Sequence, residues 1–134
     1  MEYKKSYKGL VLWLLGLAVA MFSPMLLPIR DEDLMARLML NLTSAGMAAL
    51  MVVILRTESV YWINGVTFEQ ARDAGGERRR AFAAAHLKRF CAFALGFAVL
   101  SAVAQARGIS LFWDVFFFCA GLTAAALTTI RIRL

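Results

Sequence analysis

The eleven residues YWINGVTFEQA, at positions 61–71, divide a strongly apolar chain into two halves. Tyr61 and Trp62 follow a long apolar run. Tyrosine and tryptophan are enriched at the boundary between a membrane and water. Asn64 and Gly65 are residue types that readily adopt a positive φ angle, so they predict a tight turn. We therefore expect a long helix to end at about this boundary and the chain to turn sharply.

The residues after the turn predict two more helices. Thr67 and Gln70 have the spacing of a capping box, which marks the start of a helix. Gly75 and Gly76 interrupt this helix early, and the chain beyond them is helix-prone and free of proline up to about residue 107. A helix of about 30 residues is about 45 Å long, which exceeds the ~30 Å hydrocarbon core of a bilayer. The long helix should therefore project beyond the membrane.

The composition indicates lipid as the solvent. The chain has 134 residues, of which 61% are hydrophobic and only 18% are charged, whereas soluble domains are about half apolar and a quarter charged. Four apolar stretches are long enough to span a bilayer. They cover about 9–29, 34–62, 77–107 and 110–131. The sequence thus predicts a single-domain, all-α integral membrane protein over 1–134. Four transmembrane helices form a compact bundle, and a cytoplasmic cap over about 63–89 holds a short helix and the extension of the third span.

The basic residues predict the orientation. Three precede the first span, seven lie in 56–89, and two follow the last span, whereas the other two connections hold only Arg30, Arg37 and Arg107. Under the positive-inside rule this bias places both termini and the cap in the cytoplasm. The orientation in the membrane then accounts for the net charge of +6. Nucleic acid is not an expected partner, because the basic residues lie at membrane edges without a recognisable binding module.

The sequence predicts no catalytic, metal or cofactor site. Cys91 and Cys119 are expected at membrane depths about 13 Å apart, beyond the ~7 Å that a disulfide tolerates, so both are predicted to be free, buried thiols. His86 is the only histidine. No pair of cysteines has the spacing of metal ligands, so neither a metal ion nor another cofactor is expected.

One face of the second span carries polar and small residues. Arg37, Asn41, Ser44 and Ala48 follow one another at steps of four, three and four, which places them on one side of a helix. We call these four residues the helix-two stripe. Asn41 facing lipid would be unsatisfied, so it needs a partner on another helix, in another subunit or in a water-filled pore. The stripe is thus predicted to serve either packing between helices or the lining of a pore.

Charged residues near the outer ends of the spans are expected to be boundary charges. Asp33 and Arg37 are four residues apart and suit an ion pair along one helix. Asp114 begins the last span, where a carboxylate complements the helix dipole. No ionisable residue is expected near the middle of a span, which argues against a transporter that uses an embedded carboxylate.

The cap is predicted to offer a basic surface to a partner. Each basic residue near an anionic membrane surface gains about 1 kcal/mol. Four acidic residues in 58–77 dilute this charge, so the alternative is that the arginines only fix topology. The residues expected to contact lipid or a partner protein are Tyr61, Trp62, Arg78, Arg79, Arg80, His86, Lys88 and Arg89.

Three functions follow from these patterns. The first is a non-catalytic accessory, regulatory or scaffold module whose basic cap docks either a partner protein or membrane lipid, including anionic headgroups, and which assembles with a second copy or with a partner membrane protein. The second is a homo-oligomeric channel or transporter whose path is lined by the helix-two stripe and Thr43. The third is a membrane-embedded enzyme that acts on a lipophilic substrate with Tyr61, Arg78 and His86.

Overall fold

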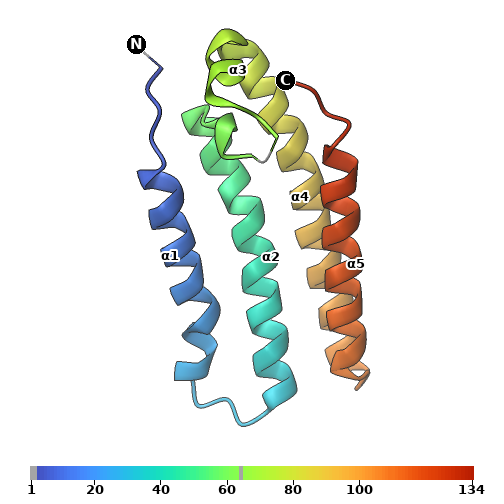
Figure 1. Ribbon diagram of the computed structural model, residues 1–134. Helices are drawn as coiled ribbons and strands as arrows, with labels where there is room; N and C mark the ends of the chain where they lie inside the picture. The colour runs from blue at the N-terminus through green and yellow to red at the C-terminus, as the bar shows by residue number, and fades with distance from the viewer. Residues whose placement is uncertain (1–2, 64) are drawn as a thin grey trace.

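The computed structural model describes residues 3–63 and 65–134, and this part of the chain is helical without any strand. Four helices are long and apolar enough to cross a membrane, as in a multi-pass membrane protein (Figure 1). They are α1 (Lys8–Phe22), which continues into the 3-10 helix η1 (Ser23–Leu26), α2 (Glu32–Thr57), α4 (Gly75–Ala106) and α5 (Leu111–Thr129). The 3-10 helix η2 (Val60–Trp62) and the short α3 (Phe68–Asp73) lie between α2 and α4.

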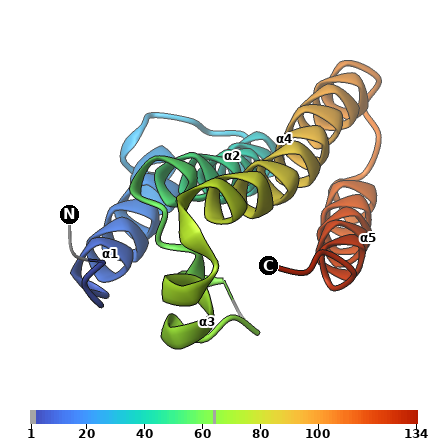
Figure 2. The same ribbon diagram turned by 90° about the horizontal axis from the view of Figure 1, so that it is seen from above.

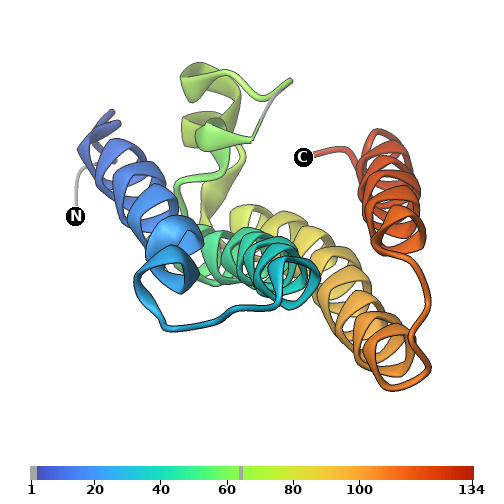
Figure 3. The same cartoon turned by 90° about the horizontal axis from the view of Figure 1, so that it is seen from below.

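The four long helices form an open row. Helices α2 and α4 make the most extensive pairing, α1 packs on α2, and α5 packs on α4 with a smaller contact to α2. End views show α1 and α5 at opposite ends of this row (Figures 2 and 3). The compact bundle predicted from the sequence is therefore not confirmed by the arrangement of the helices.

Two glycines bring neighbouring helices close together. A Cβ atom on Gly46 of α2 would collide with the side chain of Leu17 on α1. A Cβ atom on Gly121 of α5 would lie 2.8 Å from the ring of Phe93 on α4. Small residues let helix backbones approach when surrounding lipid is as apolar as the side chains, so these two positions set the spacing in the row.

The best-packed core lies at one end of the helices. Both ends of the described chain, η2 and α3 gather there, and we call it the cap end; the α1–α2 and α4–α5 connections lie at the opposite, loop end (Figure 1). By contrast, many apolar side chains of α1 and α5 are exposed, as expected of helices that have lipid as their solvent. The buried cluster at the cap end consists of Met51, Ile54, Val60, Tyr61, Ala71, Phe82 and Ala83.

Tyr61 lies inside this cluster and not at its boundary. Tyr61 is only 6% exposed. Its hydroxyl donates a hydrogen bond to the Ser6 carbonyl (2.8 Å) and accepts one from the Ser6 N–H (2.9 Å). The neighbouring Trp62 is half-buried and donates its Nε1–H to the same carbonyl (3.0 Å). The prediction that Tyr61 contacts lipid or a partner protein is wrong, because the N-terminal segment satisfies its hydroxyl and the ring is buried.

Helix α2 ends at Thr57, five residues before the predicted end. Glu58 adopts the left-handed conformation (φ 56°), which terminates the helix. Its carboxylate accepts two hydrogen bonds from Arg79 (3.0 and 2.7 Å) and one from Arg80 (2.7 Å), and its carbonyl accepts one from the Tyr3 hydroxyl (2.7 Å). These partners hold an unfavourable backbone conformation for a residue other than glycine.

The predicted capping box of α3 is confirmed. The Thr67 hydroxyl accepts from the Gln70 N–H (3.1 Å), and the Gln70 side-chain oxygen accepts from the Thr67 N–H (2.9 Å). Gly65 has the positive φ (90°) expected of the turn, whereas Asn64 lies outside the described residues. The predicted break before α4 is also confirmed: Gly75 has φ 77°, and α4 begins there, two residues earlier than expected.

We expect Thr67→Ala to destabilise α3 by about 1 kcal/mol, because the first turn loses a capped N–H. Hydrogen exchange should become faster at residues 66–75 and remain unchanged in the long helices. Thr57→Ala is the matched control, since the Thr57 hydroxyl donates only to the carbonyl of Val53 in its own helix (2.9 Å). Equal exchange in the two variants would contradict a stabilising role for the capping box.

Candidate functional site

A buried ion pair joins α2 to α5 near the loop end. Arg37 Nη2 lies 3.2 Å from Asp114 Oδ2, and the two side chains are only 4% and 1% exposed. Arg37 also donates to the carbonyl of Ile109, in the connection that precedes α5. The predicted ion pair along α2 is not formed, because Arg37 pairs with Asp114 and not with Asp33. The reason is that the row of helices places the start of α5 against the stripe of α2.

The ion pair leaves hydrogen-bonding capacity unused. Among the described residues, neither carboxylate oxygen of Asp114 accepts a well-oriented hydrogen bond, and Arg37 Nε and Nη1 donate none. Buried polar atoms are nearly always hydrogen-bonded, because leaving them without a partner is costly. The two opposite charges compensate each other, but lone pairs of Asp114 and N–H groups of Arg37 stay without a partner among the described residues.

The rest of the helix-two stripe is engaged within the chain. Asn41 donates from Nδ2 to the carbonyl of Arg37 (2.9 Å) and to the hydroxyl of Ser101 on α4 (3.1 Å). Ser44 is 1% exposed and donates to the carbonyl of Asn41 (2.9 Å), and Ala48 is also buried. The stripe therefore lies at the contact of α2 with its neighbours, and the lining of a pore stays a prediction.

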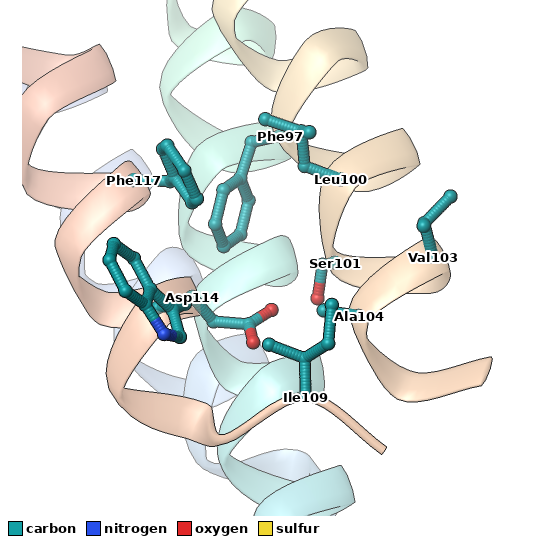
Figure 4. Close-up of a pocket in the computed structure, with 9 residues that line it drawn as sticks. Phe97, Leu100, Ser101, Val103, Ala104, Ile109, Asp114 and Phe117 are labelled. Atoms are coloured by element: carbon teal, nitrogen blue, oxygen red, sulfur yellow. The ribbon is translucent and has the colours of Figure 1, made fainter. Parts of the chain in front are cut away.

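A cavity of about 270 Å³ lies beside the ion pair, between α4 and α5. Figure 4 shows the carboxylate of Asp114 and the hydroxyl of Ser101 pointing toward one another among apolar side chains. These two are the only hydrophilic side chains among those that line it. The lining residues are Phe97, Leu100, Ser101, Val103, Ala104, Ile109, Trp113, Asp114 and Phe117.

Sequence reasoning missed this pocket, although part of its signal was present. Arg37 lies in the second turn of α2 and Asp114 in the first turn of α5, and both turns are at the loop end. Opposite charges at matching depths of two apolar helices suggest an intramembrane pair. Ser101 and the aromatic lining carried no such signal, because their grouping depends on how α4 and α5 pack.

At the cap end, Arg79 does not face solvent or headgroups as predicted. Its side chain is 12% exposed and forms the ion pair with Glu58 (2.7 Å). It also donates to the carbonyl of Ala71 (3.0 Å), and its guanidinium carbon lies 4.2 Å from the centre of the Tyr3 ring. Arg79 thus joins α2, α3, α4 and the N-terminal segment, and is a structural residue of the cap.

The other predicted contact residues fall into two groups. Arg78, Arg80 and Lys88 are exposed, although Arg80 also pairs with Glu58. Arg89 is half-buried and donates to the carbonyl of Ala85 in its own helix (2.8 Å). The structure therefore leaves three of the predicted basic residues exposed on the surface of α4.

His86 is buried, contrary to its expected place on the contact surface. It is 3% exposed, and its Nδ1 lies 3.0 Å from the carbonyl of Phe82. His86 and Arg78 line one cavity of about 750 Å³ at the cap end, but Tyr61 does not. The three residues of the enzyme hypothesis are therefore not brought together at one cavity.

The cysteines and acidic residues form no metal site in the described part of the chain, where no group of three or more potential ligands gathers. Cys91 and Cys119 are both free thiols. Cys91 is half-buried, but Cys119 is exposed on α5. The prediction of a buried thiol is wrong for Cys119, because the open row of helices leaves this residue of α5 exposed.

Comparisons with known proteins assign this chain to no family. The chain matches no protein-family model, and no characterised protein or solved structure was found to be similar to it.

Proposed function

We propose that this protein is a non-catalytic, multi-pass membrane module that acts as an accessory or regulatory subunit through a basic cap in the cytoplasm. One observation carries the proposal: the cap is held by specific contacts that leave Arg78, Arg80 and Lys88 on its surface. Arg79 and Glu58 hold the cap together, whereas Arg78 and Lys88 are exposed and Arg80 is 70% exposed despite its own pair with Glu58. A folded element with exposed positive charge suits docking onto anionic lipid headgroups.

The engagement of the uncharged polar residues in α2 supports the same proposal. Asn41 is bonded to Ser101, and Ser44 donates to the carbonyl of Asn41. A polar path through the membrane would need such groups to face water. The charge bias supports the orientation, since twelve of the fifteen basic residues lie in the segments that include the termini and the cap.

Native mass spectrometry of the protein ejected from its own membranes tests this function. The wild type should retain anionic lipid, a partner protein or both. A variant with Arg78, Arg80 and Lys88 changed to glutamine should lose them, because the charge that attracts headgroups is removed. The matched control changes Arg30 and Arg107, which lie outside the cap, to glutamine. A wild-type protein that leaves the membrane as a bare monomer would overturn the proposal.

The orientation needs a separate measurement. A single cysteine at Glu77, in a chain with Cys91 and Cys119 replaced by alanine, should react with a membrane-impermeant maleimide only after the cells are permeabilised. A cysteine at Ile109, at the loop end, should react in intact cells. The reverse pattern would place the cap outside the cell and contradict a cytoplasmic function.

Transport is the second candidate, and the buried ion pair of Arg37 and Asp114 favours it. Ionisable residues within membrane spans often mark the path of an ion or a solute. If this function is correct, purified protein in liposomes should pass potassium, sodium or protons, and Asn41→Leu should abolish the flux. Liposomes that remain impermeable to all three ions would exclude ion transport. Retention of lipid in the native mass spectrometry experiment would be unaffected.

A further inference from the structure

The loop-end pocket contains a carboxylate that is buried but incompletely satisfied. Asp114 has a side chain that is 1% exposed, and its charge is compensated by Arg37 at 3.2 Å. Neither of its oxygens accepts a well-oriented hydrogen bond from the described residues. Figure 4 shows this carboxylate pointing into the cavity. A ligand that donates a hydrogen bond to Asp114 would satisfy an acceptor that the protein itself leaves open.

The remainder of the pocket selects an apolar body. Apart from Asp114 and Ser101, its lining is aromatic and aliphatic. Its volume of about 270 Å³ is just below the ~300 Å³ at which pockets begin to hold drug-sized molecules, so the ligand should be small. Leu100, Val103 and Trp113 line the pocket and are also exposed on the flank of the helices. A lipophilic molecule dissolved in the membrane can therefore enter from the side.

The charges and the second polar group select the chemistry of the ligand's polar end. Arg37 already neutralises Asp114, so a cationic ligand would add an uncompensated charge in an apolar site. A carboxylate would meet Asp114 with like charge. Ser101 accepts a hydrogen bond from Asn41 (3.1 Å) and keeps its own hydroxyl hydrogen for another acceptor. A neutral hydroxyl group both donates and accepts, and so matches both side chains.

We infer that the loop-end pocket is a binding site for a small lipophilic alcohol. The ligand's hydroxyl donates to Asp114 and accepts from Ser101, and its apolar body lies along Trp113 and Phe117. The site lies at the opposite end of the helices from the cap, so it is independent of the proposed function of the cap. Failure of one inference leaves the other intact.

Quenching of Trp113 fluorescence by a brominated alcohol tests the site directly. Trp13→Phe and Trp62→Phe leave Trp113 as the only tryptophan, and bromine quenches it on contact. A terminally brominated octanol should quench with saturation in detergent micelles. Bromooctane should bind about ten-fold more weakly, because it lacks the hydroxyl and loses a hydrogen bond. Terminally brominated octylammonium should also bind about ten-fold more weakly, because it adds a buried charge.

Matched variants separate the pocket from general partitioning into the micelle. Val103→Phe fills the pocket and should weaken binding about ten-fold, whereas Val99→Phe, on the same helix but outside the pocket, should change it by less than about two-fold. Ser101→Ala should weaken the alcohol and leave bromooctane unchanged. Native mass spectrometry of the unaltered chain with the same three probes provides a readout that needs no tryptophan replacement. Equal binding of alcohol and bromooctane, tighter binding of the ammonium, or quenching without saturation would overturn the inference.

Discussion

Asp114→Leu is expected to lower the free energy of unfolding by about 3–5 kcal/mol, because it leaves Arg37 buried without a counter-charge. Arg37→Met should have a similar effect for the converse reason. The two side chains are only 4% and 1% exposed, so water cannot compensate for either loss. Thermal or SDS-induced unfolding in micelles, followed by circular dichroism, measures the change.

The double variant tests whether Arg37 and Asp114 are partners. Arg37→Met combined with Asp114→Leu removes both charges and should recover most of the lost stability, since an apolar pair often replaces a buried ion pair without cost. The resulting coupling free energy identifies the two residues as partners. Asp33→Leu is the control. Because Asp33 is exposed, this variant should change the free energy of unfolding by only about 0.5 kcal/mol. A loss for Asp33→Leu as large as that for Asp114→Leu would mean that Arg37 pairs along its own helix.

Arg79→Ala is expected to destabilise the cap by roughly 2–4 kcal/mol, because it removes charge-assisted hydrogen bonds from a partly buried carboxylate. Glu58 loses two bonds and the Ala71 carbonyl loses one. Hydrogen exchange should therefore accelerate throughout residues 58–75, a wider region than for the capping variant.

The neighbouring arginines are natural controls. Arg80 also pairs with Glu58, but its side chain is 70% exposed, so Arg80→Ala should cost less than about 1 kcal/mol. Arg78 is exposed, so Arg78→Ala should change stability by only about 0.5 kcal/mol. Similar losses for all three variants would contradict the distinct structural role of Arg79.

The same ion pair predicts a pH dependence. The hydrogen bond from Arg79 lowers the pKa of Glu58 below its ordinary value of 4.5. Stability from this pair is therefore fully present above pH 4.5 and is lost as the pH falls through the lowered pKa. In Arg79→Ala the pKa should return toward its ordinary value, so the difference in stability between wild type and variant should shrink in acid. A difference that stays constant down to the lowest pH at which the fold survives would contradict this linkage.

The cap illustrates which features a sequence pattern can predict. The capping box of Thr67 and Gln70 and the break at Gly75 depend on residues within one turn of each other, and both were predicted correctly. Helix α2 ends before its predicted end because Glu58 is held by Arg79, 21 residues further along the chain. The burial of Tyr61 differs from the prediction for the same reason, since its partner Ser6 is 55 residues away.

By itself, the sequence determined the four apolar helices, the turn at Gly65, the start of α3 and the break before α4. Each follows from hydropathy over about twenty residues or from the backbone preferences of adjacent residues. Only the tertiary structure decided that Arg37 meets Asp114, that Ser101 and Trp113 line a pocket beside them, and that the helices form an open row. Apolar helices can pack on several faces with similar burial. The pairing therefore depends on specific contacts between distant residues, such as the close approach at Gly121, and no local pattern encodes them.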